Sequence, residues 1–229
     1  HGSDCWNWNA AVLPSNPTHV FAQHGVTAAG SLVAGRANWL TRTLVPDNGS
    51  AIGYGGHRFG GDFWIDPGHP DAAAYTAAVL LHLVSRYDLD GLHLDRIRYP
   101  ELAIAGQTAE AGASIGYNPA SLDRFRRRYA LPADATPLPN DPRWNEWRRD
   151  QVTALVRRLY LGAIAVKPAI TVSAAVTAFG RAPASADAWA SSEPMWRVFQ
   201  DWRAWAAEGI VDLLVPMVYR AEHSTAGAD

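Results

Sequence analysis

Segments with helical spacing alternate along this chain with short apolar segments, and this alternation restricts the fold more than any other feature. Strands that alternate with helices are typical of a parallel sheet with right-handed crossovers, so the sequence predicts an α/β protein. The helices are expected over 71–87, from Asp141-Pro142 to Lys167-Pro168, and from Ser192-Pro194 to Gly209; the strands are expected over 91–95, 170–176 and 210–219, after an earlier strand that ends in 6–9.

The same pattern favours a barrel over an open nucleotide-binding sheet. No strand is followed by a G-x-G-x-x-G or G-x-x-x-x-G-K-[ST] turn, which the phosphate-binding open sheets carry. About four strand units are visible, whereas a complete eight-unit barrel takes roughly 250 residues. Two mostly irregular segments, 10–65 and 101–141, occupy much of the remaining chain, and loops of that length usually serve function.

Charge and composition exclude several classes of function. The chain of 229 residues has 20 basic and 22 acidic residues, a formal net charge of −2, and this balance argues against binding of nucleic acid through phosphate neutralisation. No apolar run approaches the ~18 residues of a membrane span, and no signal peptide is expected within this sequence. The chain has ten tryptophans and eight tyrosines, rings that stack on sugars and also fill cores. Packing in the core should use about half of them.

The segment Asp90–Pro100, D-G-L-H-L-D-R-I-R-Y-P, is the most informative for chemistry. Side chains alternate along a strand, so Gly91, His93 and Asp95 should share one face and the leucines the other. Inside a parallel barrel, buried polar groups are costly unless they are paired or used. Asp95 should stand at the carboxyl end of its strand, which is the catalytic end of this architecture.

The chain resembles a known family along most of its length. The strings W-I-D-P-G-H-P (64–70), R-Y-D-L-D-G (86–91) and H-L-D-R-I-R-Y-P (93–100) are similar to those of the bacterial glycosyl hydrolase-like family 10. G-Y-N-P, W-R-R-D-Q-V, V-S-A-A, Q-D-W and P-M-V-Y follow in the same order, at 116–119, 147–152, 172–175, 200–202 and 216–219. The resemblance implies one partial catalytic domain over 1–229, of the (β/α)8 TIM-barrel type, that covers about the third to sixth strand units.

Several expectations follow from this resemblance. The family places an acidic residue at the end of the fourth strand in the catalytic position, which here is Asp95. The expected activity is hydrolysis of O-glycosidic bonds in a polysaccharide or oligosaccharide, without a cofactor. The resemblance also implies a parent protein that is exported, and a fragment with two open sheet edges that should be unstable or sticky alone. The sequence does not predict an oligomeric state.

Glycoside hydrolysis requires a second carboxyl group besides Asp95, which we expect to act as nucleophile or base. Ile97 occupies the position that holds the acid in chitinase-like barrels, so that acid must come from elsewhere. Glu222 is favoured because it follows a strand end. The other candidates are Glu146, Asp201, Glu193 and Asp66, and the residues expected to bind substrate are His93, Arg96, Arg98, Tyr99, Trp8, Asn9, Asp66 and Tyr219.

Other interpretations of these residues remain open. Asp95 could pair with Arg96 or Arg98 for structural reasons, and His93 could be a core histidine, a partner of Asp95 or a donor to substrate. A metal-dependent hydrolase would add His57 or His69 to His93 and Asp95, but no metal site is expected because the histidines are scattered. A third possibility is a barrel that binds carbohydrate without cleaving it. The arginines of 124–128 and 148–158 are expected to form solvated helix faces.

Overall fold

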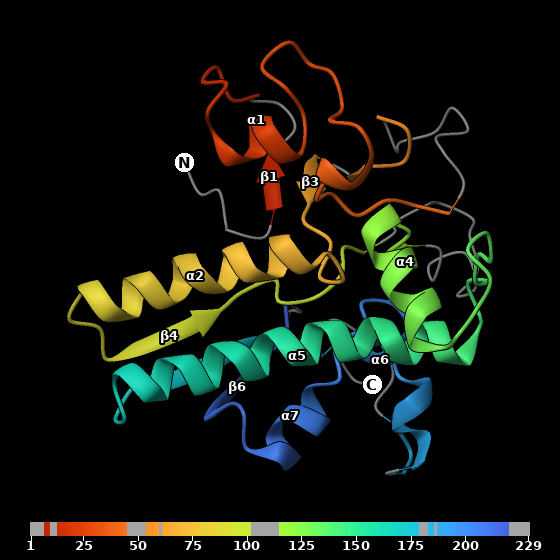
Figure 1. Cartoon of the computed structure of the whole chain (residues 1–229). Coiled ribbons are helices and arrows are strands. Elements are labelled where there is room, and N and C mark those ends of the chain that lie inside the picture. The colour runs from red at the N-terminus through yellow and green to blue at the C-terminus, as the bar shows by residue number, and fades with distance from the viewer. Residues whose placement is uncertain are drawn as a thin grey trace.

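The computed structural model describes residues 7–9, 13–44, 54–59, 61–101, 115–178, 183–185 and 187–219 (Figure 1). It is a mixed α/β protein with one parallel and one antiparallel sheet. The strands are β1 (Asn7–Asn9), β2 (Arg58–Phe59), β3 (Asp62–Trp64), β4 (Gly91–Leu94), β5 (Thr171–Thr177) and β6 (Leu213–Met217). The helices are α1 (Val20–His24), η1 (Gly35–Ala37), α2 (Pro70–Arg86), α4 (Pro119–Arg128), α5 (Pro142–Val166), η2 (Asp187–Ser191), α6 (Glu193–Trp196) and α7 (Trp202–Glu208).

The parallel sheet has the order β4-β5-β6, and α2 and α5 pack side by side over one of its faces (Figure 1). The expected alternation in β4 is confirmed: Leu92 and Leu94 are buried, whereas Gly91 and His93 are exposed. The leucines contribute to the main hydrophobic core together with residues of α2, α5 and β5. The polar face of β4 is therefore the face turned away from the helices.

Capping residues define the two long helices as the sequence predicts. Asp141 accepts a hydrogen bond from the Arg143 backbone N–H at 2.8 Å and Pro142 occupies the first turn of α5, where its missing N–H costs nothing. His69 and Pro70 start α2 in the same manner. These local interactions explain why α2 and α5 lie within about one residue of their predicted bounds.

The earliest strand differs from its prediction. Instead of joining the parallel sheet, β1 pairs antiparallel with β3, with Trp8 opposite Phe63, and β2 completes this separate sheet. The side chain of Trp8 stacks on Phe21 at 5.0 Å between ring centroids. Burying that aromatic cluster favours the antiparallel sheet, and strand periodicity alone does not define which partner a strand takes.

Two other segments also differ from the sequence analysis. The single helix expected from Ser192 to Gly209 is interrupted, because Phe199 adopts a positive φ of 54° and Gln200 turns into the core, so that α6 and α7 are separate. The mostly irregular segment 101–141 contains α4. Its start at Asn118-Pro119 has the same capping pattern as α5.

Burial corrects the prediction of a solvated arginine face at one position. Arg148 is completely buried in α5, where it donates to the carbonyl of Ile115 at 2.7 Å and lies 3.8 Å from the ring centre of Phe199. Burial lowers the pKa of Arg148 to about 9. Of the ten tryptophans and eight tyrosines, about half of which are expected in the core, the described residues include seven that are buried: Trp39, Trp64, Trp144, Trp147, Trp205, Tyr99 and Tyr117. None of the helices in the described ranges has the length and apolar character needed to cross a membrane.

Candidate functional site at the carboxyl end of strand β4

Asp95 follows the last residue of β4 directly, and its side chain is exposed. Its Oδ1 atom accepts a hydrogen bond of 2.7 Å from the backbone N–H of Arg96. Arg96 has a φ of 51°, a left-handed conformation that non-glycine residues rarely adopt. The chain therefore turns sharply after β4, and this turn fixes the Asp95 carboxylate at the carboxyl end of the parallel sheet.

His93 lies two residues before Asp95 and extends from the same exposed face of the strand. In the register of the sheet its neighbour on β5 is Ser173, and His93 Nδ1 lies 2.8 Å from the Ser173 hydroxyl oxygen. Because this contact holds the imidazole ring in one orientation, Nε2 is the ring nitrogen that remains available to a ligand near Asp95.

The two arginines after Asp95 contact the antiparallel sheet. Arg96 forms an ion pair of 3.0 Å with Asp62 of β3. The guanidinium groups of Arg96 and Arg98 lie 5.7 and 5.6 Å from the ring centre of Trp64. The carboxylate that pairs with Arg96 is thus Asp62, and β3 supplies one wall beside the carboxyl end of β4.

Gln200 connects this turn to the neighbouring strand from inside the protein. Its side-chain amide donates to the carbonyls of Ile97 and Ala175 at 3.3 and 3.1 Å, and its Oε1 accepts from the N–H of Thr177 at 2.8 Å. The side chain is completely buried. Gln200 therefore fixes the turn that carries Asp95 against the carboxyl end of β5.

Asp66 and Tyr99, both predicted substrate contacts, meet in the interior instead of at the rim. Both are completely buried, and the Tyr99 hydroxyl donates to Asp66 Oδ1 at 3.4 Å. The same oxygen accepts from the Ser121 hydroxyl and the Gly68 N–H, each at 2.8 Å. Burial raises the pKa of Asp66 to about 6, an effect that these hydrogen bonds partly oppose. Asp66 therefore links the segment that leads into α2 to Ser121 of α4, and its side chain has no surface open to a ligand.

The remaining predicted substrate contacts are dispersed. Trp8 is half-buried and packs on His19 and Phe21, whereas Tyr219 is 88% exposed just after β6. The side chain of Asn9 lies outside the described residues.

The proposed second carboxylates have different environments. Glu222 lies outside the described residues. Asp201 caps α7 and accepts from the indole N–H of Trp189 at 2.9 Å, and Glu193 pairs with Arg197 at 2.5 Å. Glu146 is exposed on α5, and its negative charge contributes to the raised pKa of Asp150. None of these described carboxylates is shown beside Asp95.

His57 and His69, the two alternatives for a metal ligand beside His93 and Asp95, are bonded to other parts of the protein. His57 is buried with its Nδ1 3.0 Å from the carbonyl of Thr41, and burial lowers its pKa to about 4. His69 caps α2 through Nδ1 and contacts the carbonyl of Arg36 through Nε2 at 2.9 Å. Across the described ranges, no three His, Cys, Asp or Glu side chains converge as metal ligands.

Sequence reasoning did not single out Ser173, Asp62 or Gln200. Ser173 occupies the β5 position opposite His93, which becomes recognisable only when the strand register is known. Asp62 lies 34 positions before Arg96, so no local spacing connects them. Gln200 belongs to the Q-D-W string at 200–202, and its burial distinguishes it from an ordinary surface glutamine.

Comparison with known proteins agrees with the resemblance seen in the motifs. The family model described as "Glycosyl hydrolase-like 10" matches residues 44–229. The chain is 28% identical over 167 residues to "Glycosyl hydrolase YngK" of Bacillus subtilis (strain 168), a match that covers 70% of this chain and 29% of that protein. It is 24% identical over 173 residues to "Glycosyl hydrolase DigH" of Escherichia coli (strain K12), covering 71% and 33% respectively. The chain thus spans about a third of the length of these relatives, and it belongs to the glycosyl hydrolase-like family 10.

Proposed function

We propose that this chain contributes the Asp95 carboxylate to the hydrolysis of O-glycosidic bonds in a polysaccharide or oligosaccharide. The observation that carries the proposal is the placement of Asp95: exposed, oriented by the Arg96 N–H, and on the same face as the His93–Ser173 pair. Membership of the glycosyl hydrolase-like family and relatives named as glycosyl hydrolases support this class of reaction.

The proposed architecture is a partial (β/α)8 barrel, with residues 1–229 as one domain. The parallel order β4-β5-β6, with α2 and α5 over one face, is compatible with successive units of such a barrel. Barrel enzymes place their catalytic residues at the carboxyl ends of the strands, which is where Asp95 stands. The exposed polar face of β4 would then face the interior of the barrel.

In the proposed reaction Asp95 acts in its ionised form. It either attacks the anomeric carbon or removes a proton from the attacking water, while a protonated carboxyl group donates to the leaving oxygen. His93, oriented by Ser173, is suited to hydrogen-bond a sugar hydroxyl next to the bond that breaks. Arg96 and Arg98 stack over Trp64 and form a cationic rim beside it.

Glu222 is our proposed proton donor. It follows β6, two strands from β4 in the same sheet, and strand spacing separates those two strands by about 10 Å. A separation of roughly 5 Å between the two carboxyl groups gives retention of configuration, and roughly 6.5–9.5 Å gives inversion. The stereochemistry of the product is therefore a direct measure of where the second carboxylate stands.

Asp95→Asn tests this proposal in an assay for reducing ends released from a panel of polysaccharides. The substitution keeps the hydrogen bond to the Arg96 N–H and removes the charge, so we expect turnover to fall by roughly 10³-fold or more without loss of folding. Asp95→Ala should regain part of its turnover with azide if Asp95 is the nucleophile or base. Normal turnover by Asp95→Asn would refute the assignment.

Asp90→Asn is the matched control, because Asp90 is exposed at the opposite end of the same strand. It should retain the activity of the wild type. If the wild type binds a polysaccharide of the panel and releases no reducing ends, the function is binding without cleavage. Because the favoured second carboxylate, Glu222, lies outside the described residues, this second function is tested in the same comparison.

A further inference from the structure

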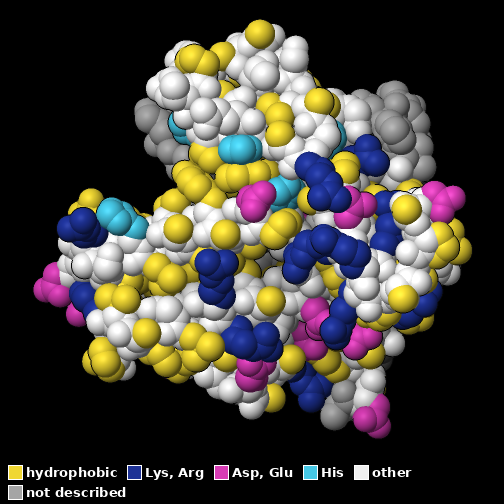
Figure 2. Space-filling view, viewed as in Figure 1, with side chains coloured by type: hydrophobic (Ala, Val, Ile, Leu, Met, Phe, Trp, Pro, Cys, Tyr) yellow, Lys and Arg dark blue, Asp and Glu magenta, His cyan; other side chains and the backbone are white. Residues whose placement is uncertain are grey.

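A groove with a volume of about 700 Å³ lies between α4 and α5, away from the β4 carboxyl end. Figure 2 shows basic side chains gathered where these two helices face each other. The lining residues come from both helices: Arg124, Arg127, Arg128, Trp147, Asp150, Gln151, Thr153, Ala154 and Arg157. Four of them are arginines and one is an aspartate, so the groove is strongly cationic although the whole chain has a net charge of −2.

Two arginines of the groove, Arg124 and Arg157, are bonded to other protein groups. Arg124 is half-buried, donates to the carbonyl of Gly68 at 2.6 Å, and lies 5.8 Å from the ring centre of Trp147. Arg157 pairs with Glu208 of α7 through two contacts. These two arginines are therefore held by protein groups, and Glu208 balances the charge of Arg157.

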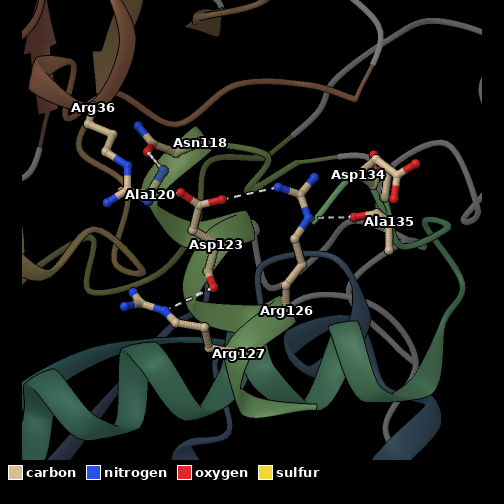
Figure 3. Close-up of polar contacts among 9 residues, drawn as sticks. Arg36, Asn118, Ala120, Asp123, Arg126, Arg127, Asp134 and Ala135 are labelled. Atoms are coloured by element: carbon tan, nitrogen blue, oxygen red, sulfur yellow. Dashed lines mark hydrogen bonds and ion pairs between the residues drawn. The ribbon is translucent and has the colours of Figure 1, made fainter. Parts of the chain in front are cut away.

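The outer wall differs, because among the described residues its arginines Arg127 and Arg128 form no ion pair, although the charge of Arg128 acts on the Asp150 carboxylate across the groove. Asp123 of α4 pairs with the guanidinium groups of Arg36 and Arg126, whereas Arg127, one turn later on α4, reaches the backbone of Asp123 (Figure 3). Arg127 uses its Nε to donate to the Asp123 carbonyl at 3.3 Å, which leaves its terminal amino groups available. In the part of the chain that the structure describes, neither Arg127 nor Arg128 forms an ion pair, and both are exposed.

We propose that this groove binds an acidic polysaccharide, whose sugar carboxylates pair with Arg127 and Arg128. Like charges held together repel each other, and an anionic ligand relieves that repulsion while using the planar fork of the guanidinium group. The choice of a carbohydrate rests on the proposed function. The groove would be a second binding site for polymer, separate from Asp95.

Features of the groove favour an acidic glycan over a nucleic acid. Binding of single-stranded nucleic acid relies on exposed aromatic rings for base stacking, and Trp147, the aromatic residue of the lining, is only 4% exposed. Asp150 adds a negative charge to the groove, which disfavours a dense polyphosphate more than a glycan with spaced carboxylates. A carboxylated sugar chain has the lower charge density that this mixed lining suits.

Calorimetric titration of the Asp95→Asn protein tests the proposal, because binding is then measured without hydrolysis. The probes are a galacturonate oligosaccharide and its methyl ester of equal length, which has the same sugar backbone and no charge. We expect binding of the acid only, weakened at high salt because added ions screen exposed charges. The Arg127→Ala/Arg128→Ala double variant should bind about tenfold or more weakly.

Two further variants separate the groove from general surface charge. Asp150→Asn removes the acidic group of the lining and should strengthen binding several-fold, a gain that damage to the fold would not produce. Arg158→Ala removes an exposed arginine of α5 outside the groove and should change nothing. Equal affinity for the acid and its methyl ester, or tighter binding of a single-stranded oligonucleotide, would overturn the proposal. The hydrolysis assay with Asp95→Asn fails or succeeds independently of these results.

Discussion

Replacing Gln200 with alanine should destabilise the folded protein by about 4–6 kcal/mol, among the larger effects of any single side chain. Gln200 is completely buried and makes three hydrogen bonds to backbone groups, at 2.8 Å to the Thr177 N–H and at 3.1 and 3.3 Å to the Ala175 and Ile97 carbonyls. Alanine supplies none of these partners. The turn after β4 and the end of β5 would therefore lose the group that joins them.

The magnitude follows from the groups left behind. A buried N–H without a partner costs about 1–3 kcal/mol, and each lost bond to a carbonyl costs about 1 kcal/mol. Removal of the buried side chain also leaves a cavity, which adds roughly another 1 kcal/mol unless water enters. The backbone N–H of Thr177 dominates this sum because it has a single proton to donate, whereas a carbonyl has two lone pairs.

Urea denaturation followed by tryptophan fluorescence measures this difference, with Gln151→Ala as the matched control. Gln151 is half-buried and makes one bond, to the carbonyl of Trp147 in its own helix at 3.2 Å, so its loss should cost less than about 1 kcal/mol. A Gln200→Ala protein within 1 kcal/mol of wild type, with an unchanged denaturant slope, would refute the reasoning.

Two further predictions concern the buried contacts around Asp66. The pKa of Asp66 is about 6 in the folded protein, against an ordinary value of 3.8, so the protonated carboxyl stabilises the folded state below pH 4 and this contribution is lost as the pH rises through 6. The free energy of unfolding of wild type should therefore fall by roughly 3 kcal/mol relative to that of Asp66→Asn between pH 4 and pH 7. Unfolding free energies of the two proteins that change in parallel across that range would contradict this. Gly68→Ala should cost about 1–3 kcal/mol because its Cβ would stand 2.4 Å from both Ser121 Oγ and Trp147 Cη2, whereas Gly61→Ala, with no atom within 4 Å, should be close to neutral in the same thermal-unfolding assay.

The parts of the fold that the sequence predicts are those governed by interactions within a few residues. The start of α5 follows from Asp141 and Pro142 because both act on the first turn of that helix. The faces of β4 follow from the alternation of Leu92, His93 and Leu94. Such signals need no knowledge of what packs against the element, so they hold regardless of tertiary structure.

The failures of prediction arise where distant groups decide the outcome. The strand β1 pairs with β3 because Trp8 packs on Phe21, and its own residues do not specify that partner. The arginines of α5 look equivalent along the sequence, yet Arg148 is buried because the carbonyl of Ile115 and the ring of Phe199 surround it. Solvation of a charged residue is a property of its neighbours in space.

The same contrast between local signals and distant contacts separates Asp66 from Asp95 in the candidate site. Asp66 and Asp95 both occur in strings that resemble the family: Asp95 is the expected nucleophile or base, and Asp66 is an expected substrate contact and a candidate for the second carboxylate. Asp66 accepts a hydrogen bond from the N–H of Gly68 two residues later, a turn interaction typical of aspartate before glycine, and its other bonds come from residues that its burial brings near. Asp95 accepts from the N–H of the next residue and faces solvent, because the turn at Arg96 ends the strand there. A reacting carboxylate must reach its substrate, and this is why we propose the exposed Asp95 for the chemistry. The enclosed Asp66 instead joins the start of α2 to α4 through its bond with Ser121.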